Sequence, residues 1–126
     1  MSAGEVRSYR DLKVWQEAMN LAEASYVLTG TFPKEEIYGM TSQIRRASVS
    51  VAANIAEGYG RDITGSYVNF LRIAQGTLKE LETHLLLAQR VKLVAATAIA
   101  PMLQKSDKIG RMLRSLIRTL QKSEDK

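Results

Sequence analysis

The sequence contains no cysteine and a single histidine, His84. Without cysteine, the chain can form neither a disulfide framework nor a thiolate metal site. A di-metal helical bundle uses a Glu-x-x-His motif on each of two helices, and a serine nucleophile needs a histidine beside it. The chain contains no Glu-x-x-His motif and no nucleophile-elbow sequence. We therefore expect no catalytic residue, no metal and no cofactor, in a protein that is not an enzyme.

Proline is almost absent, occurring only as Pro33 and Pro101, and long apolar runs are missing. The longest run, LVAATAIAPM, is too short to span a bilayer and is interrupted by Pro101. The N-terminal residues MSAGEVRSYRDLKVW lack the apolar segment of a secretory signal. We expect a cytoplasmic protein with no membrane partner.

The composition predicts an all-α protein. With 126 residues, 45% of them apolar and 25% charged, the chain is expected to form one domain over residues 1–126. Helix formers predominate, and apolar residues recur at intervals of three and four. We expect four helices over approximately residues 11–29, 36–58, 63–91 and 97–121, with frayed ends at 1–8 and 123–126. Long helices joined by short loops predict an up-and-down four-helix bundle.

Each expected helix carries an apolar stripe that we expect to face the core. The stripe of the first consists of Leu12, Trp15, Met19, Ala22 and Tyr26. That of the second consists of Ile44, Ala47, Ser48, Val51 and Ile55. That of the third consists of Tyr67, Phe70, Leu71, Ala74, Leu78, Leu81 and Leu85. That of the fourth consists of Ile109, Leu113, Leu116, Ile117 and Leu120. Some of the apolar residues outside the third stripe (Ile73, Leu86 and Leu87) are expected to meet a neighbouring subunit.

Two glycines follow the apolar stripe of the second helix, at Gly58 and Gly60. Glycine adopts the left-handed conformation of a helix C-terminus without a steric penalty. We therefore expect these glycines to end the helix, with Gly58 as its cap.

The net charge of +5 originates in one segment. Between residues 105 and 122 there are six basic residues and one acid, Asp107, which leaves an excess of five. Five of the basic residues fall opposite the apolar stripe of the last helix, and we name this set the basic face: Lys108, Arg111, Arg114, Arg118 and Lys122.

A single-sign helix face is the electrostatic footprint of a polyanion partner, and we expect nucleic acid. A solvated outer face, an acidic protein and a membrane surface are the alternatives. Arg45, Arg46 and Arg61 are candidates to extend the basic face. Because no aromatic residue accompanies the basic face, contacts to phosphates are expected rather than base stacking.

The stretch TSQIRRASVSVAANIAEGYGR (41–61) resembles the signature of the four-helix bundle proteins encoded in intervening sequences of bacterial 23S ribosomal RNA genes. The likeness continues in YRDLKVWQEAMNLA (9–22), FPKEEIYGMTSQIRRA (32–47), FLRIAQGTLKELETHLLLAQR (70–90) and IGRMLRSLIRTL (109–120). The resemblance implies a left-handed bundle that assembles into a ring-shaped homo-oligomer, a pentamer. It also implies similarity to the accessory variability protein of diversity-generating retroelements, a basic pentamer that binds nucleic acid and a reverse transcriptase.

The residues that match the family motif are Gln43, Asn54, Glu57, Gly58, Tyr59 and Gly60. Gln43, Asn54 and Glu57 fall on one polar strip of the second helix. A structural role is favoured, in which Asn54 and Glu57 tie the helix end to its neighbour, and a subunit contact at the same place is a further expectation. A ligand-binding pocket is the alternative.

The leading hypothesis is a non-enzymatic, oligomeric bundle that binds structured RNA through the basic face of the last helix. The alternative is a protein-interaction scaffold that recruits a partner protein, such as a nucleic-acid enzyme, without touching nucleic acid itself.

Overall fold

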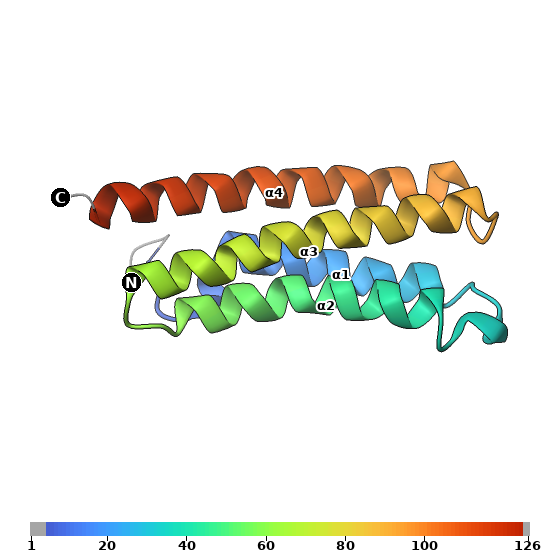
Figure 1. Ribbon diagram of the computed structural model, residues 1–126, viewed down its shortest axis with the longest axis horizontal. Helices are drawn as coiled ribbons and strands as arrows, with labels where there is room; N and C mark the ends of the chain where they lie inside the picture. The colour runs from blue at the N-terminus through green and yellow to red at the C-terminus, as the bar shows by residue number, and fades with distance from the viewer. Residues whose placement is uncertain (1–4, 125–126) are drawn as a thin grey trace.

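The computed structural model describes residues 5–124, which form four α-helices (Figure 1). These are α1 (Lys13–Thr29), α2 (Met40–Tyr59), α3 (Thr64–Arg90) and α4 (Ala96–Glu124). Two single-turn 3-10 helices precede α1 and α2, η1 (Tyr9–Asp11) and η2 (Lys34–Glu36). Over residues 5–124 there is no strand, so the predictions of an all-α fold and of four helices are confirmed. None of the described helices is long and apolar enough to cross a membrane.

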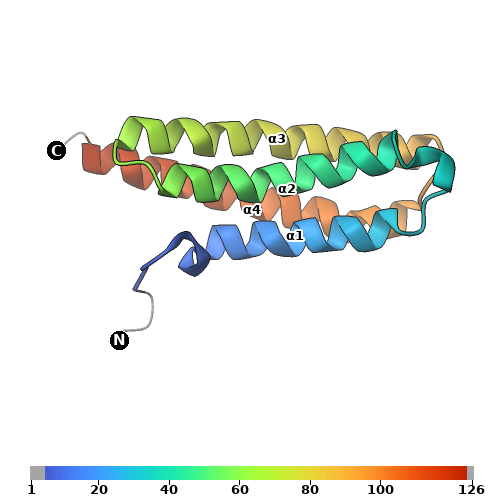
Figure 2. The same cartoon turned by 90° about the horizontal axis from the view of Figure 1, so that it is seen from below.

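Consecutive helices run in opposite directions along one long axis (Figures 1 and 2). Contacts join α1 to α2, α2 to α3, α3 to α4 and α4 back to α1. Over the described residues α2 and α4 do not contact each other, so they occupy diagonal corners of the bundle. The arrangement is the up-and-down bundle that the short loops predicted.

The helix boundaries differ from the prediction at three places. At the N-terminus, a capping box between Ser8 and Asp11 makes η1 a separate turn, so Ser8 is not frayed. The helix α1 therefore begins two residues later than expected. The second helix does not begin at residue 36, because the Glu36 carboxylate accepts a 3.1 Å hydrogen bond from the Met40 N–H and starts α2 there. At the C-terminus, Ser123 is still helical. Residues 5–7 are not helical, as expected, whereas Glu124 is the last residue of α4. Residues 1–4 and 125–126 lie outside the described residues.

The apolar stripe predicted for α1 is only partly confirmed: Ala22 is buried and Leu12 and Trp15 pack against the core, but Met19 and Tyr26 do not face it. Met19 and Tyr26 are 45% and 47% exposed, whereas the neighbouring positions Ala18, Leu21 and Ser25 are fully buried. The interior face is partly polar: Ser25 Oγ donates to the Leu21 carbonyl at 3.0 Å, and Thr29 Oγ1 donates in the same way to the Ser25 carbonyl at 2.8 Å. Because these hydroxyls are satisfied inside the helix, they can face the core at little cost.

The stripes of the other three helices are largely confirmed. All five positions predicted on α2 are buried, and so are five of the seven on α3 and three of the five on α4. The rest are half-buried (Tyr67, Phe70, Leu116 and Leu120), and all of them except Phe70 lie against the core. The residues expected outside the α3 stripe, Ile73, Leu86 and Leu87, are 44–46% exposed.

The left-handed helix cap occurs at the end of α3, not at the end of α2. Lys92 has a φ of 66°, the only positive φ of a non-glycine residue among those described. The Lys92 N–H donates to the Gln89 carbonyl at 3.0 Å, and the Leu93 N–H donates to the Ala88 carbonyl at 2.9 Å. This pair of bonds is the Schellman motif, in which glycine is the usual residue at the left-handed position.

We predict that Lys92→Gly raises the free energy of unfolding by about 1 kcal/mol, because it removes the steric cost of a left-handed Cβ. Lys92→Ala is the matched control, since it removes the same side chain but keeps the Cβ. Urea denaturation should place the control at or near the wild-type stability. Equal stabilisation by the two variants would contradict the strained cap.

Candidate nucleic-acid interface

The basic face lies on the outer, solvent-exposed side of α4. Its five residues are exposed, and they repeat at intervals of three and four along the helix while Ile109, Leu113 and Ile117 point into the core. At 1.5 Å per residue, the face is about 21 Å long. No aromatic residue occurs in Ala96–Glu124.

Ion pairs occupy part of the basic face. Arg111 Nη1 lies 3.0 Å from Asp107 Oδ2 in the same helix, and Lys108 Nζ lies 3.3 Å from Glu17 Oε2 of α1. Both pairs are substantially exposed, so they constrain their cations only weakly. Arg114 and Arg118 have no acidic partner within residues 5–124. The two central arginines are therefore available to a polyanion.

Arg45 and Arg46 do not extend the basic face, because α2 lies diagonally across the bundle from α4. Arg61 lies in the loop after α2 and is engaged by other side chains. Arg45 is held against α1: its Nε donates to Thr29 Oγ1 at 2.8 Å, and its guanidinium lies 4.4 Å from the centre of the Tyr26 ring. Arg46 donates to Gln43 Oε1 at 2.7 Å within its own helix. Arg61, at the opposite end of α2, pairs with Glu57 and lies over the Phe70 ring.

Two cations of α3 lie beside the basic face. Arg72 and Lys79 line a groove between α3 and α4 that Arg114 lines from the other side. The sequence analysis did not propose them, although their spacing of seven residues, two helical turns, places them on one flank of α3. Only the pairing of α3 with α4 shows which helix that flank meets.

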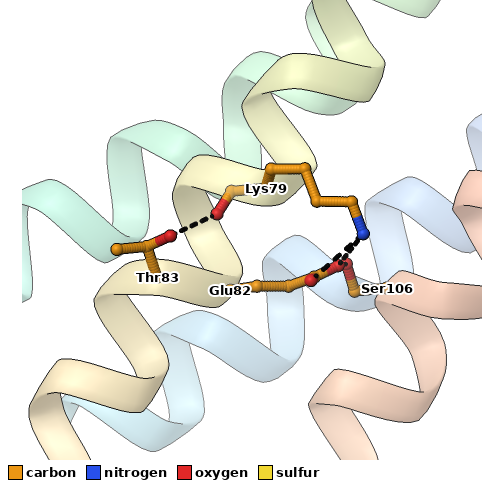
Figure 3. Close-up of polar contacts among 4 residues, drawn as sticks. All are labelled: Lys79, Glu82, Thr83 and Ser106. Carbon is orange, nitrogen blue, oxygen red and sulfur yellow. Dashed lines mark hydrogen bonds and ion pairs between the residues drawn. The ribbon is translucent and has the colours of Figure 1, made fainter.

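A buried polar contact joins the two helices at this groove (Figure 3). Ser106 of α4 is 1% exposed, and its Oγ donates to Glu82 Oε2 of α3 at 2.6 Å. Lys79 Nζ lies 3.3 Å from Glu82 Oε1. The carboxylate is thus fixed from two sides, and the Glu82 side chain remains 22% exposed in the lining of the groove.

The family-motif residues of α2 make contacts that differ from the expected ones. Asn54 Nδ2 donates to the Ser50 carbonyl at 2.9 Å, within the same helix, and Glu57 pairs with Arg61 at 2.8 Å. Neither side chain ties the helix end to a neighbouring helix. Asn54 is half-buried and Glu57 is exposed, so the polar strip lies open in the single chain.

Gly58 is not the cap of α2. It lies inside the helix and is buried, and Gly60, which follows the last helical residue, has a right-handed φ of −77°. A Cβ at position 58 would lie 2.9 Å from the Phe70 Cβ and 3.0 Å from the Tyr67 Cδ1. The glycine is therefore required by the close approach of α3, not by a turn.

Aromatic residues pack around this close approach. The Tyr59 and Tyr67 rings meet edge to face at 6.1 Å between centroids. Burial raises the pKa of the Tyr67 phenol above its usual value, and the neighbouring Tyr59 raises it further. The two rings thus pack at the end of the α2–α3 pair, with the Tyr67 phenol in its neutral form.

We predict that Gly58→Ala lowers the free energy of unfolding by about 1–3 kcal/mol, because the added methyl group overpacks the contact with α3. Gly76→Ala is the matched control, since a Cβ there has no atom within 4 Å. The control should stabilise the protein by up to about 1 kcal/mol through helix propensity. Stabilisation by both variants in urea denaturation would show that the helices are farther apart than described.

A second surface feature is apolar. Six apolar side chains are 45% or more exposed on α1, on α2 and in the segment between them: Met19, Tyr26, Val27, Ile37, Tyr38 and Val49. Four of them (Tyr26, Ile37, Tyr38 and Val49) line a groove of about 680 Å³ together with Arg45 and Arg46.

No group of three or more His, Asp or Glu residues that could hold a metal ion occurs in the described part of the chain.

Comparisons with known proteins give one family and one fold. Residues 10–115 match the family described as 23S rRNA-intervening sequence protein. The crystal structure of a protein with unknown function from the S23 ribosomal protein family of Bacteroides thetaiotaomicron is similar, with 24% sequence identity and a TM-score of 0.74. The likeness covers 82% of this chain and 97% of that one, and at this identity it shows the fold alone. No curated protein matches the sequence.

Proposed function

Since the chain belongs to the 23S rRNA-intervening sequence protein family, we propose that it is a non-enzymatic protein that binds structured RNA through the basic face of α4. The family name and the name of the similar crystal structure both refer to the ribosome or its RNA. The single observation that carries the proposal is the exposed row of cations on α4, in which Arg114 and Arg118 have no acidic partner within residues 5–124.

The chemistry of the basic face favours phosphate. Its three arginines present planar guanidinium groups that bind phosphate oxygens through paired hydrogen bonds. A row about 21 Å long can contact several phosphates at once, and each contact releases counterions. The binding would therefore be strongly salt-dependent.

A folded RNA fits the basic face better than a flexible single strand. Stacking platforms for single strands need aromatic side chains beside the cations. Here the aromatic residues lie in η1, α1, α2, the segment between α1 and α2, and the start of α3, while α4 has none. Cations without stacking partners suit the ordered phosphates of an RNA helix.

A ring-shaped homo-oligomer, a pentamer by resemblance, would repeat the basic face around its axis. Linked copies bind a large RNA more tightly than one copy through effective concentration. The exposed apolar residues of the α1–α2 groove and of α3 are the surfaces that copies could bury against each other.

A protein-interaction scaffold is the second candidate, and one observation favours it. The α1–α2 groove has an aromatic and aliphatic lining with two arginines at its edge, which is the composition of protein interfaces. A partner such as a nucleic-acid enzyme would then account for a link to RNA without direct contact. Capture of that partner that survives nuclease treatment would favour the scaffold.

We predict that reversing Arg111, Arg114 and Arg118 to Glu weakens binding to a structured RNA by about a hundredfold and lowers the salt slope by about three. Fluorescence anisotropy with a labelled hairpin RNA, repeated from low to physiological salt, measures both. The matched control changes Lys34, Arg90 and Lys92 to Glu, which alters the net charge by the same amount. These three residues lie at the end of the bundle where α3 is connected to α4 (Figure 1). If the control variant binds as poorly, the affinity reflects net charge and the basic face is not the interface.

A further inference from the structure

The groove between α3 and α4 continues the basic face into the bundle. It encloses about 370 Å³, and Arg114 lines it while also belonging to the basic face. Ligand pockets range from about 300 to 1,000 Å³, so the groove is large enough for one small planar group. An RNA bound along α4 would pass directly over it.

The groove exists because side chains are missing where the two helices face each other. Gly110 of α4 is half-buried, and a Cβ built there would lie 4.0 Å from the Leu78 Cδ1 of α3. Gly76 lines the α3 side, where a Cβ would have nothing within 4 Å. Between the two glycines the groove is therefore lined by backbone and the Leu78 side chain, which leaves room for a flat ring.

Cationic side chains line the opening of the groove, and a carboxylate lies deeper, on its floor. The Lys79 side chain is 74% exposed, and Lys79, Arg72 and Arg114 line the opening. One exposed acid, Asp107, also lines it, and Arg111 pairs with that acid at 3.0 Å. The Glu82 side chain is 22% exposed and is fixed on the floor by Ser106 (Figure 3). A phosphate is attracted to the rim but repelled from the floor, where only a hydrogen-bond donor is favourable.

We propose that this groove receives one unpaired RNA base that carries an exocyclic amino group, with Glu82 accepting from the amino group and Arg72 and Arg114 binding the adjacent phosphates. This inference rests on the proposed RNA binding. Bases splayed out of bulges and loops are the usual targets of sequence-specific RNA recognition, and a guanidinium plane can stack on them. The half-buried amide of Gln75, also in the lining, can read a second position of the base edge.

The carboxylate makes the site selective. Adenine, cytosine and guanine each have an amino group that can donate to Glu82. Uracil has no amino group, and its one edge donor, N3–H, lies between two carbonyl oxygens that Glu82 repels. An unpaired adenosine or cytidine is therefore preferred over an unpaired uridine, although the phosphates contribute equally to both.

The test compares four hairpin RNAs that share one stem: fully paired, or with one unpaired adenosine, cytidine or uridine. Anisotropy titrations at physiological salt should give about tenfold tighter binding of the adenosine and cytidine hairpins than of the paired stem. The uridine hairpin should bind like the paired stem. Wild-type protein that binds all four equally overturns the groove proposal but leaves the basic face intact. Protein that binds none of them overturns both.

Gly110→Leu fills the groove without changing charge and with a better helix former. It should abolish the preference for the adenosine and cytidine hairpins while leaving the affinity for the paired stem unchanged. Ser115→Leu is the matched control, since it adds leucine to the α1 side of the same helix, outside the groove, and should keep the preference. Glu82→Gln keeps an acceptor for Ser106 but adds an amide donor, so it should shift the preference toward uridine. A preference that survives both Gly110→Leu and Glu82→Gln overturns the proposal.

Discussion

The orientation of α3 about its own axis is the constraint on which the rest of the structure depends. Leu71, Leu81 and Leu85 are fully buried in the centre of the bundle, and α3 contacts both α2 and α4. With this stripe facing inward, one flank of α3 brings Phe70 against Gly58 of α2. The opposite flank brings Glu82 onto α4. The stripe therefore decides which polar residues meet at each interface.

The diagonal relation between α2 and α4 divides the surface into two chemically different regions. The outer side of α4 is cationic and without aromatic residues, while α1, α2 and the segment between them expose aromatic and aliphatic side chains. The arginines of α2 belong to the second region, where Arg45 contacts the Tyr26 ring. One region suits phosphates and the other suits protein surfaces. Membership of the 23S rRNA-intervening sequence family agrees with the first use and does not exclude the second.

Much of this fold follows from helical periodicity, because the stripes of α2, α3 and α4 are almost wholly apolar. The stripe of α1 could be found only in part in this way, since Ser25 and Thr29 are buried with their hydroxyls bonded to their own helix. Gly58 was misassigned for a related reason: a glycine near a helix end indicates a cap, and only the position of Phe70 shows that it serves a close contact.

The candidate site divides similarly into a predictable and an unpredictable part. The basic face is a property of one helix, and its spacing is visible in the sequence. The groove is formed by residues on two helices, with Gly76 and Gly110 far apart in the chain. No local pattern can indicate that these positions meet, or that a carboxylate lies between them.

The central claim is that structured RNA lies along the outer side of α4, and lysine footprinting tests it most directly. The protein would be acetylated with and without a saturating hairpin RNA, and the modified lysines would be quantified by mass spectrometry. The account predicts that RNA protects Lys108 and Lys122, while Lys34 and Lys92 at the far end of the bundle stay reactive (Figure 1). Protection of Lys34 and Lys92, with Lys108 and Lys122 unchanged, would contradict it.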